Sequence, residues 1–172
     1  LGDKYGKIKF FKWGTVIFLV SSALCALSVS WLTLIISRSL QAIGAAMTMA
    51  TSNGIIVEVF PDNKRGQALG WMGSFVSLGG IIGPSIGGIL LNFFPWHIIF
   101  WLNVPIGIIA VVILFKYLPS KLDKTFKNDG FDLVGSIMLL VGFISMFIGI
   151  LLSQQLGWGD WRILTLTIVG LI

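Results

Sequence analysis

The sequence predicts an all-α membrane protein, a polytopic bundle of about six transmembrane helices. Three stretches contain no Asp, Glu, Lys or Arg: 25 residues at 13–37, 50 at 66–115 and 27 at 133–159. A helix needs about 20 apolar residues to cross the roughly 30 Å hydrocarbon core of a bilayer. Charged residues make up 11% of the chain and hydrophobic ones 56%, whereas soluble domains carry about 25% charged residues. So few charges cannot cover the surface of a soluble protein.

Six spans follow from these stretches. The first is expected at 13–30 and the second at 32–58. The 50-residue stretch must hold two helices, at 67–91 and 98–118, because Pro95 cannot continue a helix and disfavours helical geometry before it. The fifth is expected at 131–153, and the sixth begins near Trp161 and is cut short at Ile172. Since the chain also begins without Met or a signal peptide, we expect an internal piece of a longer membrane protein.

Basic residues gather in alternate connections. Ten of the 12 Lys and Arg residues lie before the first span, between the second and third, and between the fourth and fifth. If the spans alternate, all ten lie on one side, which the positive-inside rule assigns to the cytoplasm. Tryptophans gather near the opposite ends, as interfacial indoles do: Trp31, Trp96, Trp101, Trp158 and Trp161. The sequence thus predicts a multi-pass protein of the cell membrane with cytoplasmic basic loops.

Several function classes are disfavoured. One cysteine and one histidine cannot build a metal site, and no phosphate-binding glycine loop with its lysine is present. No pair of intramembrane carboxylates occurs either, so we predict no enzyme, no catalytic residue, no metal and no cofactor. The net charge of +5 follows from the membrane orientation and does not indicate nucleic-acid binding. The expected partners are the lipid bilayer and whatever solute crosses it.

Arg38 is the strongest candidate for a functional residue. It lies about seven residues into the second span, roughly 10 Å along the helix from the outer end. A charge at such a depth costs at least ~2.5 kcal/mol and usually faces a cavity or a partner. Snorkelling to the surface is the alternative, which this depth disfavours. Gln41 and Gly44 follow on the same side, so this face is predicted to line a water-filled pathway. Since Arg38 cannot release its proton, it would act through its field on a carboxylate or an anionic group.

The third span carries a glycine-proline motif. Small residues every four positions form one bare stripe, which allows close backbone packing between helices in lipid. The motif comprises Gly79, Gly80, Gly83, Pro84, Gly87 and Gly88. Pro84 removes the hydrogen bond to the carbonyl of Gly80 and is expected to bend the helix. Simple helix packing is the alternative, but so many glycines beside a proline favour a pliable helix against a moving partner.

A short charged turn precedes the first span. It comprises Asp3, Lys4, Gly6 and Lys7, and such a turn is usually a solvated loop. Its expected position at a cytoplasmic helix junction makes a functional role for this turn more plausible than for an ordinary loop. Glu58 ends the second span on the same side, where it could pair with this turn.

Together these segments resemble the major facilitator superfamily, and more narrowly its fourteen-span drug:proton antiporters. Residues 1–7 resemble the end of the family's cytoplasmic loop motif, although Ile8 stands where a second basic residue is usual. Residues 34–46, with Arg38, Gln41 and Gly44, are similar to the fourth-span motif implicated in proton coupling. The glycine-proline motif at 79–88 matches the fifth-span motif associated with antiporters.

The resemblance implies that the six spans are the family's third to eighth. Residues 1–118 would belong to the N-terminal bundle, 119–130 to a basic cytoplasmic connection, and 131–172 to two extra linking spans, because the connection is short. The implied function is proton-coupled export of drugs or other amphipathic or cationic compounds by alternating access. A uniporter, symporter or metabolite exporter of the same fold is the nearest alternative. A channel or a scaffold is disfavoured, since no polar stripe follows several spans and a scaffold needs no buried Arg38.

The implied partners are protons and a small-molecule substrate. If the source is a two-membrane bacterium, a periplasmic adaptor is a further expected partner.

Overall fold

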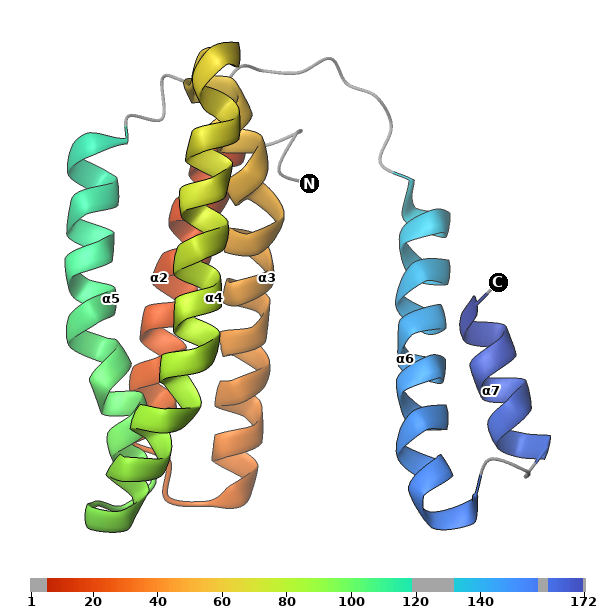
Figure 1. Ribbon diagram of the computed structural model, residues 1–172. Coiled ribbons are helices and arrows are strands. Elements are labelled where there is room, and N and C mark those ends of the chain that lie inside the picture. The colour runs from red at the N-terminus through yellow and green to blue at the C-terminus, as the bar shows by residue number, and fades with distance from the viewer. Residues whose placement is uncertain (1–5, 119–131, 158–160, 172) are drawn as a thin grey trace. The chain divides into compact units, whose positions relative to one another are not determined.

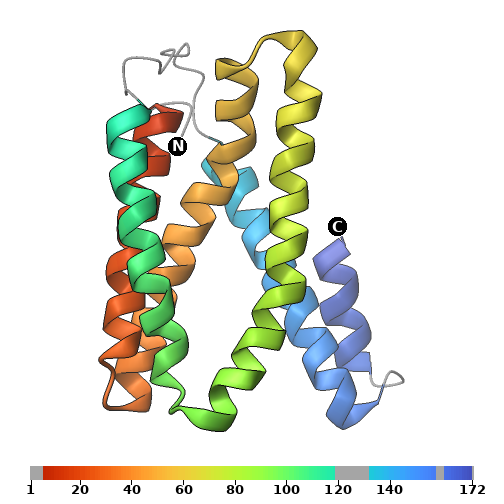
Figure 2. The same ribbon diagram turned by 60° about the vertical axis from the view of Figure 1, so that its left-hand side comes forward.

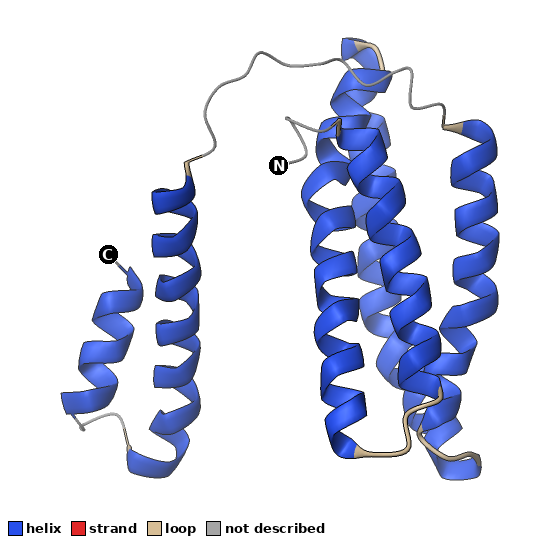
Figure 3. Cartoon of the chain, turned by 180° about the vertical axis from the view of Figure 1, so that it is seen from behind, coloured by secondary structure: helices blue, strands red, loops and turns tan. Residues whose placement is uncertain are grey.

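The computed structural model describes residues 6–118, 132–157 and 161–171. Every regular element in this part of the chain is a helix, as Figure 3 shows, which confirms the predicted all-α class. The chain divides into two compact units, Leu1–Lys127 and Asn128–Ile172, which we describe separately. Within the described ranges, five helices are long and apolar enough to cross a membrane.

Each predicted span corresponds to one helix. The first unit contains α2 (Lys7–Ala26), α3 (Trp31–Val59), α4 (Asp62–Phe93) and α5 (His97–Tyr117) (Figure 1). The second contains α6 (Leu133–Leu156) and α7 (Trp161–Leu171). The predicted break in the long neutral stretch is confirmed, because α4 ends just before Pro95 and α5 begins just after it. The predicted connection at 119–130 lies outside the described residues.

The helix ends differ from the predicted limits. α2 begins at Lys7 and ends at Ala26, not at residues 13 and 30, and α4 begins at Asp62, not near 67. At the starts of α2 and α4, backbone hydrogen bonding continues through charged residues that lie beyond the uncharged stretches used for the prediction. α2 ends before residue 30 because residues 27–30 form the turn that leads to Ser30, the N-cap of α3. Gly6 precedes α2 with a φ of 94°, a conformation that favours glycine.

Local signals set the other helix ends. The Ser30 hydroxyl accepts a hydrogen bond from the Thr33 amide at 3.3 Å, and Thr33 Oγ1 accepts one from the Ser30 amide at 3.2 Å. This reciprocal pair satisfies two amides at the start of α3. At the start of α6, Asp132 Oδ1 accepts a hydrogen bond from the Gly135 amide at 2.8 Å.

α4 continues through the proline of its motif. Pro84 lies inside the helix, and Figure 2 shows α4 changing direction along its green, C-terminal part. A proline inside a helix removes one backbone hydrogen bond and displaces the preceding turn. The bend expected from the sequence is therefore present.

The first unit is assembled around the contact between α2 and α3. A Cβ atom at Gly44 would lie 2.6 Å from the backbone nitrogen of Phe18 and 2.8 Å from the carbonyl oxygen of Gly14. Only glycine permits this approach of the two backbones. α5 adds Phe100, which packs with Cys25 and Ala26 of α2 in the small buried core.

The second unit uses the same kind of contact. A Cβ atom at Gly170 of α7 would lie 2.7 Å from the carbonyl oxygen of Gly142 and 2.6 Å from the Cβ of Met146. Ile163 is fully buried, as are most of the Ser145 and Ser153 side chains. In lipid, where apolar side chains gain little by leaving the solvent, such close packing and local hydrogen bonds supply the attraction between helices.

We predict that Gly44→Ala destabilises the protein by about 1–3 kcal/mol, because the added methyl group must push α2 and α3 apart. Gly66→Ala is the matched control, since a Cβ at Gly66 meets no atom within 4 Å. Thermal unfolding of the detergent-solubilised protein, followed by size-exclusion chromatography after heating, measures the difference. Equal transition temperatures for the two variants would contradict the close contact.

Candidate functional site

Arg38 lies on the second turn of α3 with its guanidinium held by two neighbours. Arg38 Nη1 donates a hydrogen bond to Oε1 of Gln41 at 2.8 Å. The guanidinium carbon lies 4.5 Å from the centroid of the Phe100 ring, a cation–π distance. One partner comes from its own helix and the other from α5, so the cation sits where α3 meets α5.

A chain of hydrogen bonds continues from Arg38 into α2. Gln41 is only 4% exposed, and its Nε2 donates to the hydroxyl oxygen of Ser22 at 2.7 Å. The Ser22 hydroxyl in turn donates to the carbonyl oxygen of Phe18 at 2.7 Å. Buried polar groups in a membrane protein must find such partners, because neither water nor lipid supplies them. Gln41 therefore links the position of Arg38 to the packing of α2.

The sequence predicted that the face of α3 with Arg38, Gln41 and Gly44 lines a water-filled pathway. In the structure, most of this face packs against another helix. Gln41 and Gly44 are buried against α2 in this part of the chain, while Arg38 lies at the edge of the contact. The physical reason is that a small residue beside an amide also suits close helix packing, which sequence alone cannot distinguish from a cavity wall. Only Arg38 of the three retains exposed surface.

Glu58 and Lys7 form an ion pair at the other end of α2 and α3. Lys7 Nζ lies 2.6 Å from Glu58 Oε1, and the two side chains are 20% and 10% exposed. Gly54 leaves room for the lysine, because a Cβ there would lie 3.0 Å from Lys7 Cδ. The structure thus joins one residue of the predicted charged turn to Glu58. Asp3 and Lys4 lie outside the described residues.

The glycine-proline motif lies on a helix with no buried residue. At Gly79, Gly80, Gly83, Gly87 and Gly88, an added Cβ would meet no atom within 4 Å beyond the helix's own local backbone. α4 therefore presents a bare stripe that no described residue of this unit fills.

Two features near these residues were missed by sequence reasoning. Lys12 of α2 is buried, with 7% of its surface exposed, and its Nζ lies 4.9 Å from the centroid of the Phe115 ring on α5. His97 contacts the carbonyl oxygen of Ser28 through Nε2 at 3.1 Å. Neither contact has a sequence signal, because each joins segments that are distant in the chain: α2 with α5 for Lys12, and the turn after α2 with the start of α5 for His97.

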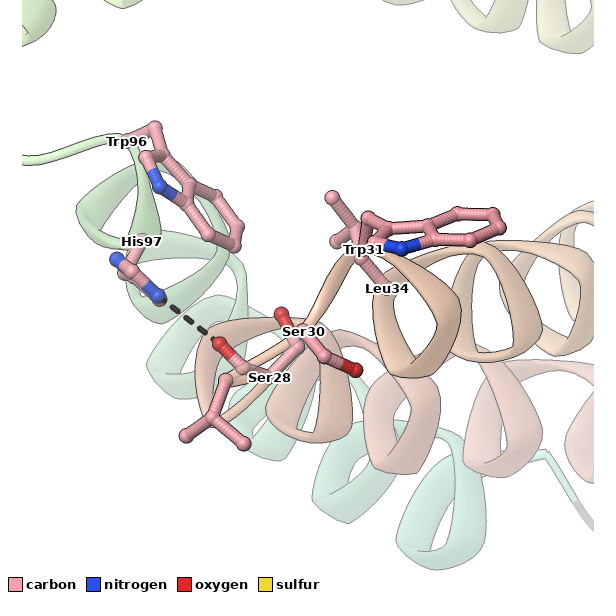
Figure 4. Close-up of a pocket in the computed structure, with 7 residues that line it drawn as sticks. Ser28, Ser30, Trp31, Leu34, Trp96 and His97 are labelled. Atoms are coloured by element: carbon pink, nitrogen blue, oxygen red, sulfur yellow. Dashed lines mark hydrogen bonds between the residues drawn. The ribbon is translucent and has the colours of Figure 1, made fainter.

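A pocket lies around His97, between the start of α5 and the turn that joins α2 to α3. Its volume is about 510 Å³. Figure 4 shows Trp96 and His97 on one side and Trp31 on the other, with Ser28 and Ser30 between them. Among the described residues, no cluster of His, Cys, Asp or Glu could hold a metal ion.

These observations define a polytopic helical membrane protein with a cation at a helix contact inside its first unit. A sequence profile of the Major Facilitator Superfamily matches residues 1–172, so the chain belongs to this family, whose members are transporters and not enzymes.

Relatives in bacteria have transporter names. The chain is 45% identical over 139 residues to the riboflavin transporter RibZ of Clostridioides difficile (strain 630). The match covers 80% of this chain and 30% of that protein. It is 32% identical over 170 residues to multidrug resistance protein 3 of Bacillus subtilis (strain 168), covering 98% of this chain and 33% of that protein. It is also 32% identical over 173 residues to the multidrug transporter protein MdtP of the same organism. This match covers 100% of this chain and 32% of that protein. The chain thus spans about a third of the length of these relatives.

We predict that Lys7 and Glu58 stabilise the protein together. In a double-mutant cycle of Lys7→Ala and Glu58→Ala, we expect a coupling energy of about 1 kcal/mol, the upper end for exposed pairs, because this pair is largely buried. Thermal unfolding in detergent measures it. The exchanged pair, Lys7→Glu with Glu58→Lys, should recover part of the stability that either charge reversal loses; no recovery would argue against a direct ion pair.

Proposed function

We propose that this chain is part of a proton-coupled exporter of drugs or other amphipathic or cationic small molecules. The observation that carries the proposal is the setting of Arg38. A permanent cation stands about two turns into α3, tied through Gln41 to α2, at the edge of a packed contact. A charge kept inside a membrane span at several kcal/mol of cost indicates a role in moving charge or solute.

Arg38 would act through its field. Its proton does not leave, so it stabilises the ionised form of a carboxylate that comes close. Among the described residues, the ion pairs join Lys7 to Glu58 and Arg65 to Asp62, and none includes Arg38. We propose that the proton-carrying carboxylate belongs to a part of the transporter outside this chain, which spans about a third of its relatives' length.

α4 would supply the moving contact. Its bare glycine stripe accepts the close approach of another helix, and Pro84 leaves the helix able to bend there. In alternating access, two bundles rock against each other around a site near the membrane midplane. We assign the stripe to the surface along which they move.

The proposed domain arrangement follows the family resemblance. Residues 1–118 form part of the N-terminal bundle, 119–130 a cytoplasmic connection, and 131–172 two linking spans of a fourteen-span protein. The protein lies in the cell membrane with its basic loops in the cytoplasm. Protons, the small-molecule substrate and, in a two-membrane bacterium, a periplasmic adaptor are its proposed partners.

A transporter of one metabolite is the second candidate. The specific observation that favours it is the 45% identity to a protein named as a riboflavin transporter, higher than the 32% to the multidrug proteins cited here. Uptake and efflux of riboflavin and of a cationic dye by cells that express the intact transporter distinguish the two candidates. Movement of riboflavin alone would favour the metabolite transporter.

We predict that Arg38→Ala abolishes substrate-dependent proton flux in proteoliposomes and leaves the amount of folded protein unchanged. The field that keeps the proton site ionised is then lost. Arg65→Ala is the control, since Arg65 pairs locally with Asp62 in the first turn of α4. Normal flux with Arg38→Ala would remove this residue from the mechanism.

The orientation is tested separately by cysteine labelling. In a variant in which Cys25 is replaced by alanine, we expect Lys124→Cys to react with a membrane-impermeant thiol reagent only from the cytoplasmic side. Phe94→Cys should react only from outside. The reverse pattern in intact cells and inverted vesicles would overturn the proposed topology.

A further inference from the structure

Phe100 contacts Arg38 from the buried core of the first unit. Its side chain is 6% exposed and packs with Cys25 and Ala26 of α2 and with Leu34 of α3. The Arg38 guanidinium carbon lies 4.5 Å from the ring centroid. Phe100 is thus at once a core residue, which three helices hold in place, and the partner of the cation.

A series of aromatic contacts fixes the ring from the outer end. Trp96 meets Phe100 edge to face, with centroids 6.0 Å apart and an interplanar angle of 85°. The His97 ring stacks on the Trp96 ring, with centroids 3.6 Å apart. His97 Nε2 donates a hydrogen bond to the Ser28 carbonyl oxygen at 3.1 Å, which the dashed line in Figure 4 marks. The orientation of the Phe100 face is therefore set by the turn between α2 and α3 as well as by the core.

We propose that Phe100 is a positioning residue for Arg38, and that Trp96 and His97 hold Phe100 for this purpose. The inference rests on the proposed role of Arg38 in proton coupling. A neutral ring attracts a guanidinium through its negative face, but more weakly than a carboxylate does. Together with the Gln41 hydrogen bond, Phe100 therefore keeps the cation in place while no ionised carboxylate is near, and both neutral partners release it when one forms. A fixed anionic partner would not allow that exchange.

Fluorination of the ring tests the contact without changing its packing. In the intact transporter, Phe100→3,4,5-trifluorophenylalanine, introduced by stop-codon suppression, nearly preserves the shape and withdraws charge from the face of the ring. We expect phenylglyoxal to modify Arg38 faster, by roughly 2- to 30-fold, the range that the strength of cation–π contacts implies. Peptide mass spectrometry gives the rate at each arginine, and Arg65 serves as the internal reference. An unchanged rate at Arg38 overturns the proposal.

The matched control is the same fluorinated residue at Phe75 of α4 in the same unit, which is 66% exposed and whose ring stacks on Trp71. It should leave the Arg38 rate unchanged. An equal acceleration by both variants would show a general effect of fluorination and would also overturn the proposal.

A transport measurement separates this inference from the proposed function. The fluorinated Phe100 variant should shift the pH at which transport is half-maximal while its thermal transition stays unchanged, because the cation is less firmly held. Phe100→Trp, which retains a π face, should keep the wild-type pH profile provided that it folds. If Arg38→Ala abolishes coupling but fluorination of Phe100 changes neither labelling nor pH profile, Phe100 has no positioning role. If fluorination accelerates labelling but Arg38→Ala transports normally, the contact stands and the proposed function fails.

Discussion

The first unit depends on one close approach of two backbones. Gly14 of α2 and Gly44 of α3 bring the helices together at a distance that a single methyl group would prevent. Between helices in lipid, contact is driven by packing and by hydrogen bonds instead of by release of water. The glycine contact provides the first, and the Gln41–Ser22 hydrogen bond in the same interface provides the second.

The same interface determines where the charges lie. Because α2 and α3 run side by side, Lys7 reaches Glu58 at one end, and Gln41 reaches both Ser22 and Arg38 further along. α5 then completes the setting of Arg38 with the face of Phe100. One helix pair thus connects a cytoplasmic ion pair of the proposed topology to the intramembrane cation, and a movement of α2 against α3 would affect both.

α4 is different in kind from the helices beside it. It is the longest helix of the unit, yet it buries no residue within it, and a Cβ added at any of its glycines would meet no atom within 4 Å beyond the helix's own local backbone. A helix that carries its small residues outward is suited to pack against a partner that approaches and withdraws, since there are few side chains to interlock. This contrast between a closed α2–α3 contact and an open α4 stripe is the basis on which we propose α4 as the moving contact in alternating access.

Much of the fold could be predicted from the sequence, because the absence of charge over a membrane thickness is a one-dimensional property. The six helices, the break at Pro95 and the bend at Pro84 all follow from local rules of hydropathy and backbone geometry. Arg38 also stood out, since a charge within an apolar run is visible without a structure. The tertiary structure alone decided which faces meet: that Gln41 and Gly44 turn toward α2, that the Phe100 ring contacts the Arg38 guanidinium, and that His97 reaches Ser28. These contacts join residues 19 to 69 positions apart in the chain, and helical periodicity gives each residue a face but not the neighbour that the face will meet.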